Sequence, residues 1–133
     1  MVARKDYLHV MTINQSGQDE FVAPIDLENC LQIFNGDRGV VLELLGDFLR
    51  LLDEQKKSIA EALAGSDQEK LRREAHSIKG AAAVFSAWSV MEAAADLEGV
   101  GKTGDLAGGG DAYSRLEREI GRLTSCYMTF KER

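Results

Sequence analysis

The sequence has 133 residues, of which 44% are hydrophobic and 29% are charged, a size and composition typical of one globular domain. The longest apolar stretches, such as Ala81–Phe85, fall far short of the roughly 18 to 20 residues of a membrane span, and residues 1–10 lack the apolar core of a secretory signal. Twenty-two acidic residues against sixteen basic ones give a net charge of −6, which argues against binding to nucleic acid or to an anionic membrane. We therefore expect a cytoplasmic protein.

The two cysteines, Cys30 and Cys126, stand far apart and belong to no CxxC or Cys/His pattern. Such spacing fits neither a disulfide framework nor a zinc site, so we expect both to behave as small buried apolar residues. The sequence also has no ExxH or HxxxH pair, so no metal site is expected.

The N-terminal segment, residues 1–23, shows no sustained periodicity and contains the polar stretch 14–20. We interpret it as a flexible arm, ordered only where apolar residues near its end dock, and we place the globular domain at residues 24–133. The chain has a single proline, Pro24, so the long stretches after it are free to be helical. Their apolar residues recur at helical period.

A short helix is predicted first, between a capping Asp26 and the left-handed stop Asn35-Gly36. A longer helix follows, from about Asp37 to Ala64, and ends at Gly65. Its inward positions keep helical spacing and are Val41, Leu45, Phe48, Leu52 and Ile59.

The third predicted helix begins at Ser66, which can form a capping box with Glu69. Its core stripe has steps of four and three and consists of Leu71, Ala75, Ile78, Ala82 and Phe85. Ser86 either ends this helix or caps the fourth one, which is expected to stop near Gly99–Gly101.

Residues 101–110 hold five of the thirteen glycines and are predicted to form a loop. The last helix shows an inward stripe of Tyr113, Leu116, Ile120, Leu123, Tyr127 and Phe130. Four long amphipathic helices with short connections predict an all-α fold, an antiparallel four-helix bundle with a short preceding N-terminal helix.

Of the two histidines, His9 lies in the predicted arm and His76 in the third predicted helix. His76 lies at the edge of the core stripe, so its imidazole should be exposed. The cations Arg72, Arg73 and Lys79 lie within one turn of it and would hold an anion bound to the ring. An exposed histidine among cations is more often only a solvated helix face, so position alone does not establish a site.

Gly80 strengthens the functional interpretation. Glycine inside a helix costs about 1 kcal/mol relative to alanine, and nothing in the predicted helix requires it at this position. Gly80 and the small Ala83 follow His76 at one and two turns, so a partner surface can lie flat on this part of the helix.

Residues 75–83, AHSIKGAAA, resemble the signature of histidine-containing phosphotransfer (HPt) domains, which is His-x-(Ile/Leu)-Lys-Gly followed by small residues. The likeness extends from about Ile25 to Phe130. It includes the stretches Phe34–Asp37, Leu44–Leu52, Leu97-Glu98 and Thr103–Leu106. Members of the family usually carry glycine ten residues after the histidine, where this chain has Ser86.

The resemblance implies that His76 is the phosphorylated nucleophile, that Lys79 stabilises the phosphoryl group and that Gly80 clears space for the partner. Glu98 lies where some members place a polar residue near the site. We expect only a supporting role for it, because a carboxylate repels a phosphoryl group. The residues expected to bind the partner are Gly80, Ala83, Arg72 and Arg73.

The implied function is the relay of a phosphoryl group between His76 and the aspartate of response-regulator receiver domains in a two-component phosphorelay. The sequence has no glycine-rich phosphate loop and no acidic cluster suited to magnesium and a nucleotide, so the chain is expected to carry phosphoryl groups without kinase activity of its own. No cofactor is expected, because the receiver supplies the magnesium. The expected partners are a receiver domain, a hybrid sensor kinase or both, and the chain is expected to be a monomer.

The alternative is a non-catalytic helical-bundle interaction module that binds a receiver or another partner without transfer. Such a module needs no nucleophile at position 76, no Lys79 and no Gly80. The presence of all three therefore favours transfer.

Overall fold

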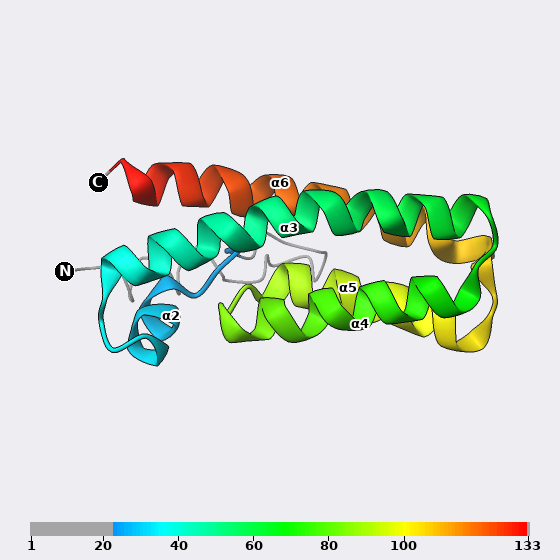
Figure 1. Ribbon diagram of the computed structural model, residues 1–133, viewed down its shortest axis with the longest axis horizontal. Coiled ribbons are helices and arrows are strands. Elements are labelled where there is room, and N and C mark those ends of the chain that lie inside the picture. Colours follow the sequence, from blue (N-terminus) through cyan, green and yellow to red (C-terminus); the bar gives the residue numbers. More distant parts are fainter. Residues whose placement is uncertain (1–22, 133) are drawn as a thin grey trace, which may run out of the picture.

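Over residues 23–132, which the computed structural model describes, four long helices lie side by side in antiparallel order (Figure 1). They are α3 (Arg38–Ala64), α4 (Gln68–Val84), α5 (Trp88–Thr103) and α6 (Gly109–Lys131). The short α2 (Leu27–Ile33) covers one end of the bundle, and the 3₁₀ turn η1 (Leu106–Gly108) precedes α6. The predicted all-α fold is confirmed.

The N-terminal side of the described chain joins the core. Ala23 is 3% exposed and Ile25 is 1% exposed, so both side chains are buried in the core. The rest of the predicted arm, including His9, lies outside the described residues. Within residues 23–132 no helix combines the length and the apolar character needed to cross a membrane.

The predicted apolar stripes of the long helices form the core. Leu52, Leu71 and Leu97 are completely buried, and each such side chain contributes about 1.5 to 3 kcal/mol through removal from water. Two residues of the stripe predicted for the last helix, Tyr113 and Tyr127, are only partly buried.

The cysteines are both free thiols. Cys30 is fully buried, and this burial, with a smaller effect of the Asp26 charge, raises the pKa of its thiol to about 11. It is therefore the small apolar core residue that was expected. Cys126 is only partly buried.

Aspartates begin three of the helices. The side chains of Asp26, Asp37 and Asp67 accept hydrogen bonds from backbone N–H groups three residues ahead, at 3.1, 3.1 and 3.0 Å, as N-caps do. The predicted capping box of Ser66 with Glu69 is wrong, because Asp67 caps α4 and Ser66 has a left-handed backbone with φ of 52°.

Ser86 ends α4 with a left-handed φ of 58°, and it does not cap α5, whose N-cap is Ala87. Its hydroxyl accepts a hydrogen bond of 2.7 Å from Asn29 Nδ2, and its carbonyl accepts one of 2.9 Å from the Asp26 N–H. Ser86 thus occupies a conformation that glycine adopts without strain, and its side chain ties α2 to the turn between α4 and α5.

The expected helix stop near Gly99–Gly101 is wrong. Helix α5 continues to Thr103 and ends at Gly104, which has a left-handed φ of 77°. A Cβ at Gly101 would lie 2.8 Å from the backbone nitrogen of Arg72, so this glycine permits the backbones of α5 and α4 to approach closely. The predicted loop is correspondingly shorter, since α6 already begins at Gly109.

Replacing Ser66 by glycine is expected to raise the free energy of unfolding by up to about 1 kcal/mol. A non-glycine residue with this φ is strained, and the exposed Ser66 side chain makes no hydrogen bond to another described residue. Ser86→Gly is the matched control. The free energy of unfolding should rise less in this variant, because it also loses the hydrogen bond to Asn29, which is worth about 1 kcal/mol. Urea unfolding measures both, and a Ser66→Gly variant no more stable than the wild type would contradict strain at this position.

Candidate functional site

His76 lies in the second half of α4, next to the core stripe. The buried Ala75 and Ile78 place α4 against the bundle, while the side chain of His76 is 63% exposed. The predicted exposure of the imidazole is therefore what the structure shows.

Glu98, on α5, is the closest polar partner of His76. It is only 4% exposed, and its Oε2 lies 2.7 Å from His76 Nδ1. An ionised carboxylate can only accept a hydrogen bond, so Nδ1 carries the hydrogen and donates it. The other nitrogen of the neutral ring, Nε2, then has a free lone pair on the exposed side chain.

Two lysines share the same carboxylate. Lys79 Nζ lies 2.6 Å from Glu98 Oε1, and Lys102 Nζ lies 3.8 Å from Oε2. The hydrogen bond from Lys79, helped by the one from His76 and by the charges of Lys79 and Lys102, lowers the pKa of the Glu98 carboxyl although burial opposes this. Glu98 is therefore charged at neutral pH, and the site contains one buried anion and two cations.

The arginines contribute less directly than the sequence suggested. The guanidinium of Arg72 binds Glu69 with hydrogen bonds of 3.1 and 2.5 Å, and Arg72 lies two turns before Lys79 on α4. Arg73 is exposed and belongs to none of the ion pairs among residues 23–132. The structure therefore brings Lys79 to His76, but leaves both arginines at the margin.

Gly80 and Ala83 extend the exposed surface of α4 beyond His76. A Cβ at Gly80 would meet no atom within 4 Å, so no contact within the described chain requires glycine there. Ala83 is partly buried and presents only a methyl group. The surface next to the imidazole is consequently low and open.

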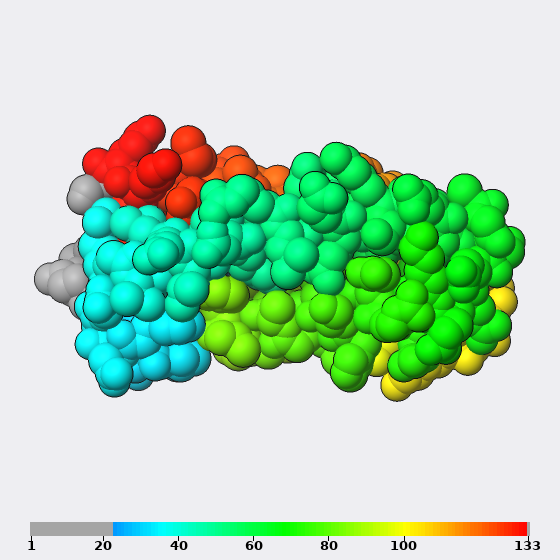
Figure 2. Space-filling view, in the orientation of Figure 1, coloured from blue at the N-terminus to red at the C-terminus, as the bar shows by residue number. Residues whose placement is uncertain are grey.

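Exposed apolar side chains lie beside this surface, and sequence reasoning missed them. Gln55 Nε2 donates a 2.9 Å hydrogen bond to Ser77 Oγ, a pairing that sets the register of the antiparallel α3 and α4. Figure 2 shows the face on which these two helices lie side by side. The apolar patch consists of Leu44, Leu51 and Val84, which are 39%, 49% and 50% exposed.

This register places Leu51 one turn from Gln55 towards the N-terminus of α3, and Val84 two turns from Ser77 towards the C-terminus of α4. Both therefore lie on the same side of the Gln55–Ser77 pair, along the line from His76 through Gly80. The sequence contained one indication of this apolar patch. Leu44 and Leu51 are seven residues apart in the second predicted helix, yet neither belongs to its core stripe.

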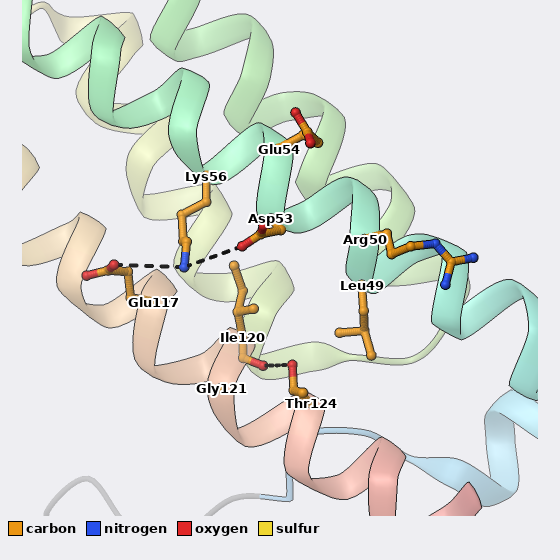
Figure 3. Close-up of a pocket in the computed structure, with 9 residues that line it drawn as sticks. All are labelled: Leu49, Arg50, Asp53, Glu54, Lys56, Glu117, Ile120, Gly121 and Thr124. Carbon is orange, nitrogen blue, oxygen red and sulfur yellow. Dashed lines mark hydrogen bonds and ion pairs between the residues drawn. The ribbon is translucent and has the colours of Figure 1, made fainter.

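A groove between α3 and α6 is the other candidate surface (Figure 3). Lys56 bridges it, with its Nζ 3.9 Å from Asp53 and 4.0 Å from Glu117. None of its nine lining residues is a histidine, so the groove holds no candidate for phosphorylation on an imidazole. In the described part of the chain, no group of three or more His, Cys, Asp or Glu side chains could hold a metal ion.

Comparisons with known proteins agree with this geometry. Residues 43–126 match the family model described as Hpt domain. The fold is similar to the crystal structure of histidine-containing phosphotransfer protein B from Pseudomonas aeruginosa PAO1, with a TM-score of 0.66 and 24% sequence identity, over 80% of this chain and 87% of that one. At this identity the likeness supports the fold alone. No curated protein matches the sequence.

The hydrogen bond to Glu98 predicts the tautomer of His76. At a pH where the imidazole is neutral, ¹⁵N NMR should show a protonated Nδ1 and an unprotonated Nε2, because Glu98 accepts only from Nδ1. In Glu98→Ala this preference should be lost. A wild-type ring protonated mainly on Nε2 would contradict the assignment.

Proposed function

Since the family model covers more than half of its residues, this chain belongs to the Hpt domain family, and from that premise we propose that His76 is its phosphorylated residue. Hpt domains exchange phosphoryl groups with the aspartate of response-regulator receiver domains, and the chain acts in such a phosphorelay. The observation that carries the assignment to His76 is its exposed ring, held through Nδ1 by the buried Glu98.

The transfer step uses the free lone pair of His76. Nε2 attacks the phosphorus of the receiver's aspartyl phosphate, the bond between phosphorus and nitrogen forms, and the bond to the aspartate oxygen breaks, which releases the carboxylate. Because Nδ1 keeps its hydrogen, the ring becomes positively charged. Glu98, 2.7 Å away, stabilises that charge without having to move. The reverse transfer follows the same steps backwards.

Lys79 supports the reaction by its charge. Its ammonium binds Glu98 Oε1 at 2.6 Å, so it orients the carboxylate and adds a positive charge near the transferred phosphoryl group. Arg72 and Arg73, at the margin of the site, add to the positive potential that an acidic receiver pocket meets. Charges of this kind act chiefly on the association rate.

The receiver docks on the open surface formed by Gly80, Ala83 and the apolar patch. Exposed apolar side chains beside a reactive group are typical of a protein contact, and the absence of a Cβ at Gly80 lets the partner approach the ring. The magnesium used in transfer belongs to the receiver. The hybrid sensor kinase as a partner, the monomeric state and the cytoplasmic location stay predictions.

The non-catalytic alternative accounts for less. A pure binding module could use the apolar patch, but it gives no role to a buried carboxylate shared by an exposed histidine and two lysines. Burying a charge is unfavourable unless it is paired, so we favour transfer.

His76→Gln is expected to abolish phosphate acceptance while the chain stays folded, because the side chain is largely exposed and its loss costs chiefly the hydrogen bond to Glu98. Acid-labile, base-stable phosphate after mixing with a phosphorylated receiver measures acceptance, and urea unfolding measures stability. Persistent phosphorylation, or an unfolded variant, would contradict the role of His76 as an exposed nucleophile.

Substitutions of Gly80 are expected to act in opposite directions on the stability of the fold and on the rate of phosphoryl transfer. Gly80→Ala should raise the free energy of unfolding by up to about 1 kcal/mol, because alanine favours the helix and its methyl group meets open space. Gly80→Gln should fold but transfer slowly from a receiver, since its side chain keeps the reacting atoms outside the roughly 3 to 3.5 Å range of attack.

The control is a small phosphodonor such as phosphoramidate, which needs no docking surface and should phosphorylate Gly80→Gln at nearly the wild-type rate. Equal loss with both donors would show that Gly80 serves the local chemistry. Unchanged transfer from the receiver would remove Gly80 from the docking surface.

A further inference from the structure

Lys102 was not singled out from the sequence, yet the fold brings it to Glu98. Gly101 lies against the backbone of Arg72, one turn before His76 on α4. The turn of α5 that carries Lys102 is therefore adjacent to the turn of α4 that leads into the nucleophile. Lys102 is thus a second cation of the site, from a different helix than Lys79.

The two lysines bind Glu98 differently. Lys79 lies 2.6 Å from Oε1, and its side chain is 35% exposed. Lys102 lies 3.8 Å from Oε2, the oxygen that also binds His76 Nδ1, and its side chain is 61% exposed. Lys79 is a close partner of the carboxylate, whereas Lys102 is a looser one on the imidazole side.

Phosphorylation changes the charge balance of this cluster. A phosphoryl group adds a charge of about −2 next to the ring, while the buried Glu98 keeps its own negative charge. If Lys79 turned to the phosphoryl group, Glu98 would lose its closest cation and keep only the imidazole and the more distant Lys102, and weaker pairing of a buried charge is unfavourable. Lys102 can move without that loss, because its head group is in solvent on a flexible four-carbon stem.

We propose that Lys102 is the lysine that binds the oxygens of the phosphoryl group on His76, while Lys79 stays on Glu98. This inference rests on the proposed function of His76 and assigns a different role to each of the two lysines. Lys102 contacts the transferred group, and Lys79 keeps the positioning carboxylate charged and in place.

The phosphoryl group itself reports the contact. A neighbouring ammonium favours the dianion, so loss of the contact raises the second pKa of the phosphoryl group. The chain is phosphorylated with phosphoramidate, and the ³¹P chemical shift of phospho-His76 is followed against pH in the range where the phosphohistidine survives. Lys102→Met should raise this pKa by about 0.2 to 0.7, the effect of an exposed ion pair, and Lys102→Arg should restore it.

Lys57→Met is the matched control, because Lys57 is equally exposed, at 65%, and pairs with Asp53 on α3. It should leave the phosphoryl pKa unchanged. Lys79→Met should lower the midpoint of urea unfolding more than Lys102→Met does, and should shift the phosphoryl pKa less.

The inference is overturned if Lys102→Met gives the same phosphoryl pKa as Lys57→Met, or if Lys79→Met raises it more than Lys102→Met. The first comparison does not depend on the stability of the Lys79 variant. A wild-type chain that accepts no phosphate on His76 would instead overturn the proposed function, and the inference with it.

Discussion

The site depends on a negative charge that the bundle buries. Glu98 is 4% exposed and lies between His76 and two lysines. A buried carboxylate is stable only while it is paired and hydrogen-bonded. Donor atoms of the neighbouring side chains must therefore point towards it. One of those atoms is His76 Nδ1, and this contact leaves Nε2 as the nitrogen available for chemistry.

Packing between α4 and α5 sets this contact. The backbones come close where Gly101 meets Arg72, which brings the Glu98 and Lys102 turns of α5 to the His76 turn of α4. On the other side of α4, Gln55 and Ser77 fix the register with α3 and leave Leu51 exposed beside the open surface at Gly80. The docking surface therefore continues along α4 from the imidazole, while Glu98 and the lysines hold the ring from the α5 side.

Much of this could be predicted from the sequence, because local signals determine it. Helical spacing identified the core faces, and His76, Lys79 and Gly80 share one turn of helix, so their proximity needs no tertiary information. The pairing of His76 with Glu98 was different, since it depends on the relative register of α4 and α5. Gly101 was interpreted as a helix stop, although it serves close packing, and Lys102 was therefore placed in a loop. The left-handed Ser66 was misinterpreted because serine more often caps a helix than ends one, whereas ending α4 was one of the two roles expected for Ser86.

The most direct test is to locate the phosphoryl group within the ring after transfer from a phosphorylated receiver. In a ¹⁵N-labelled chain, coupling between ³¹P and the ring nitrogens distinguishes the two positions. The phosphorus should couple to Nε2 of His76, with Nδ1 still protonated towards Glu98. A phosphoryl group on Nδ1, or on any other residue, would contradict the account, because the geometry leaves only Nε2 free to attack.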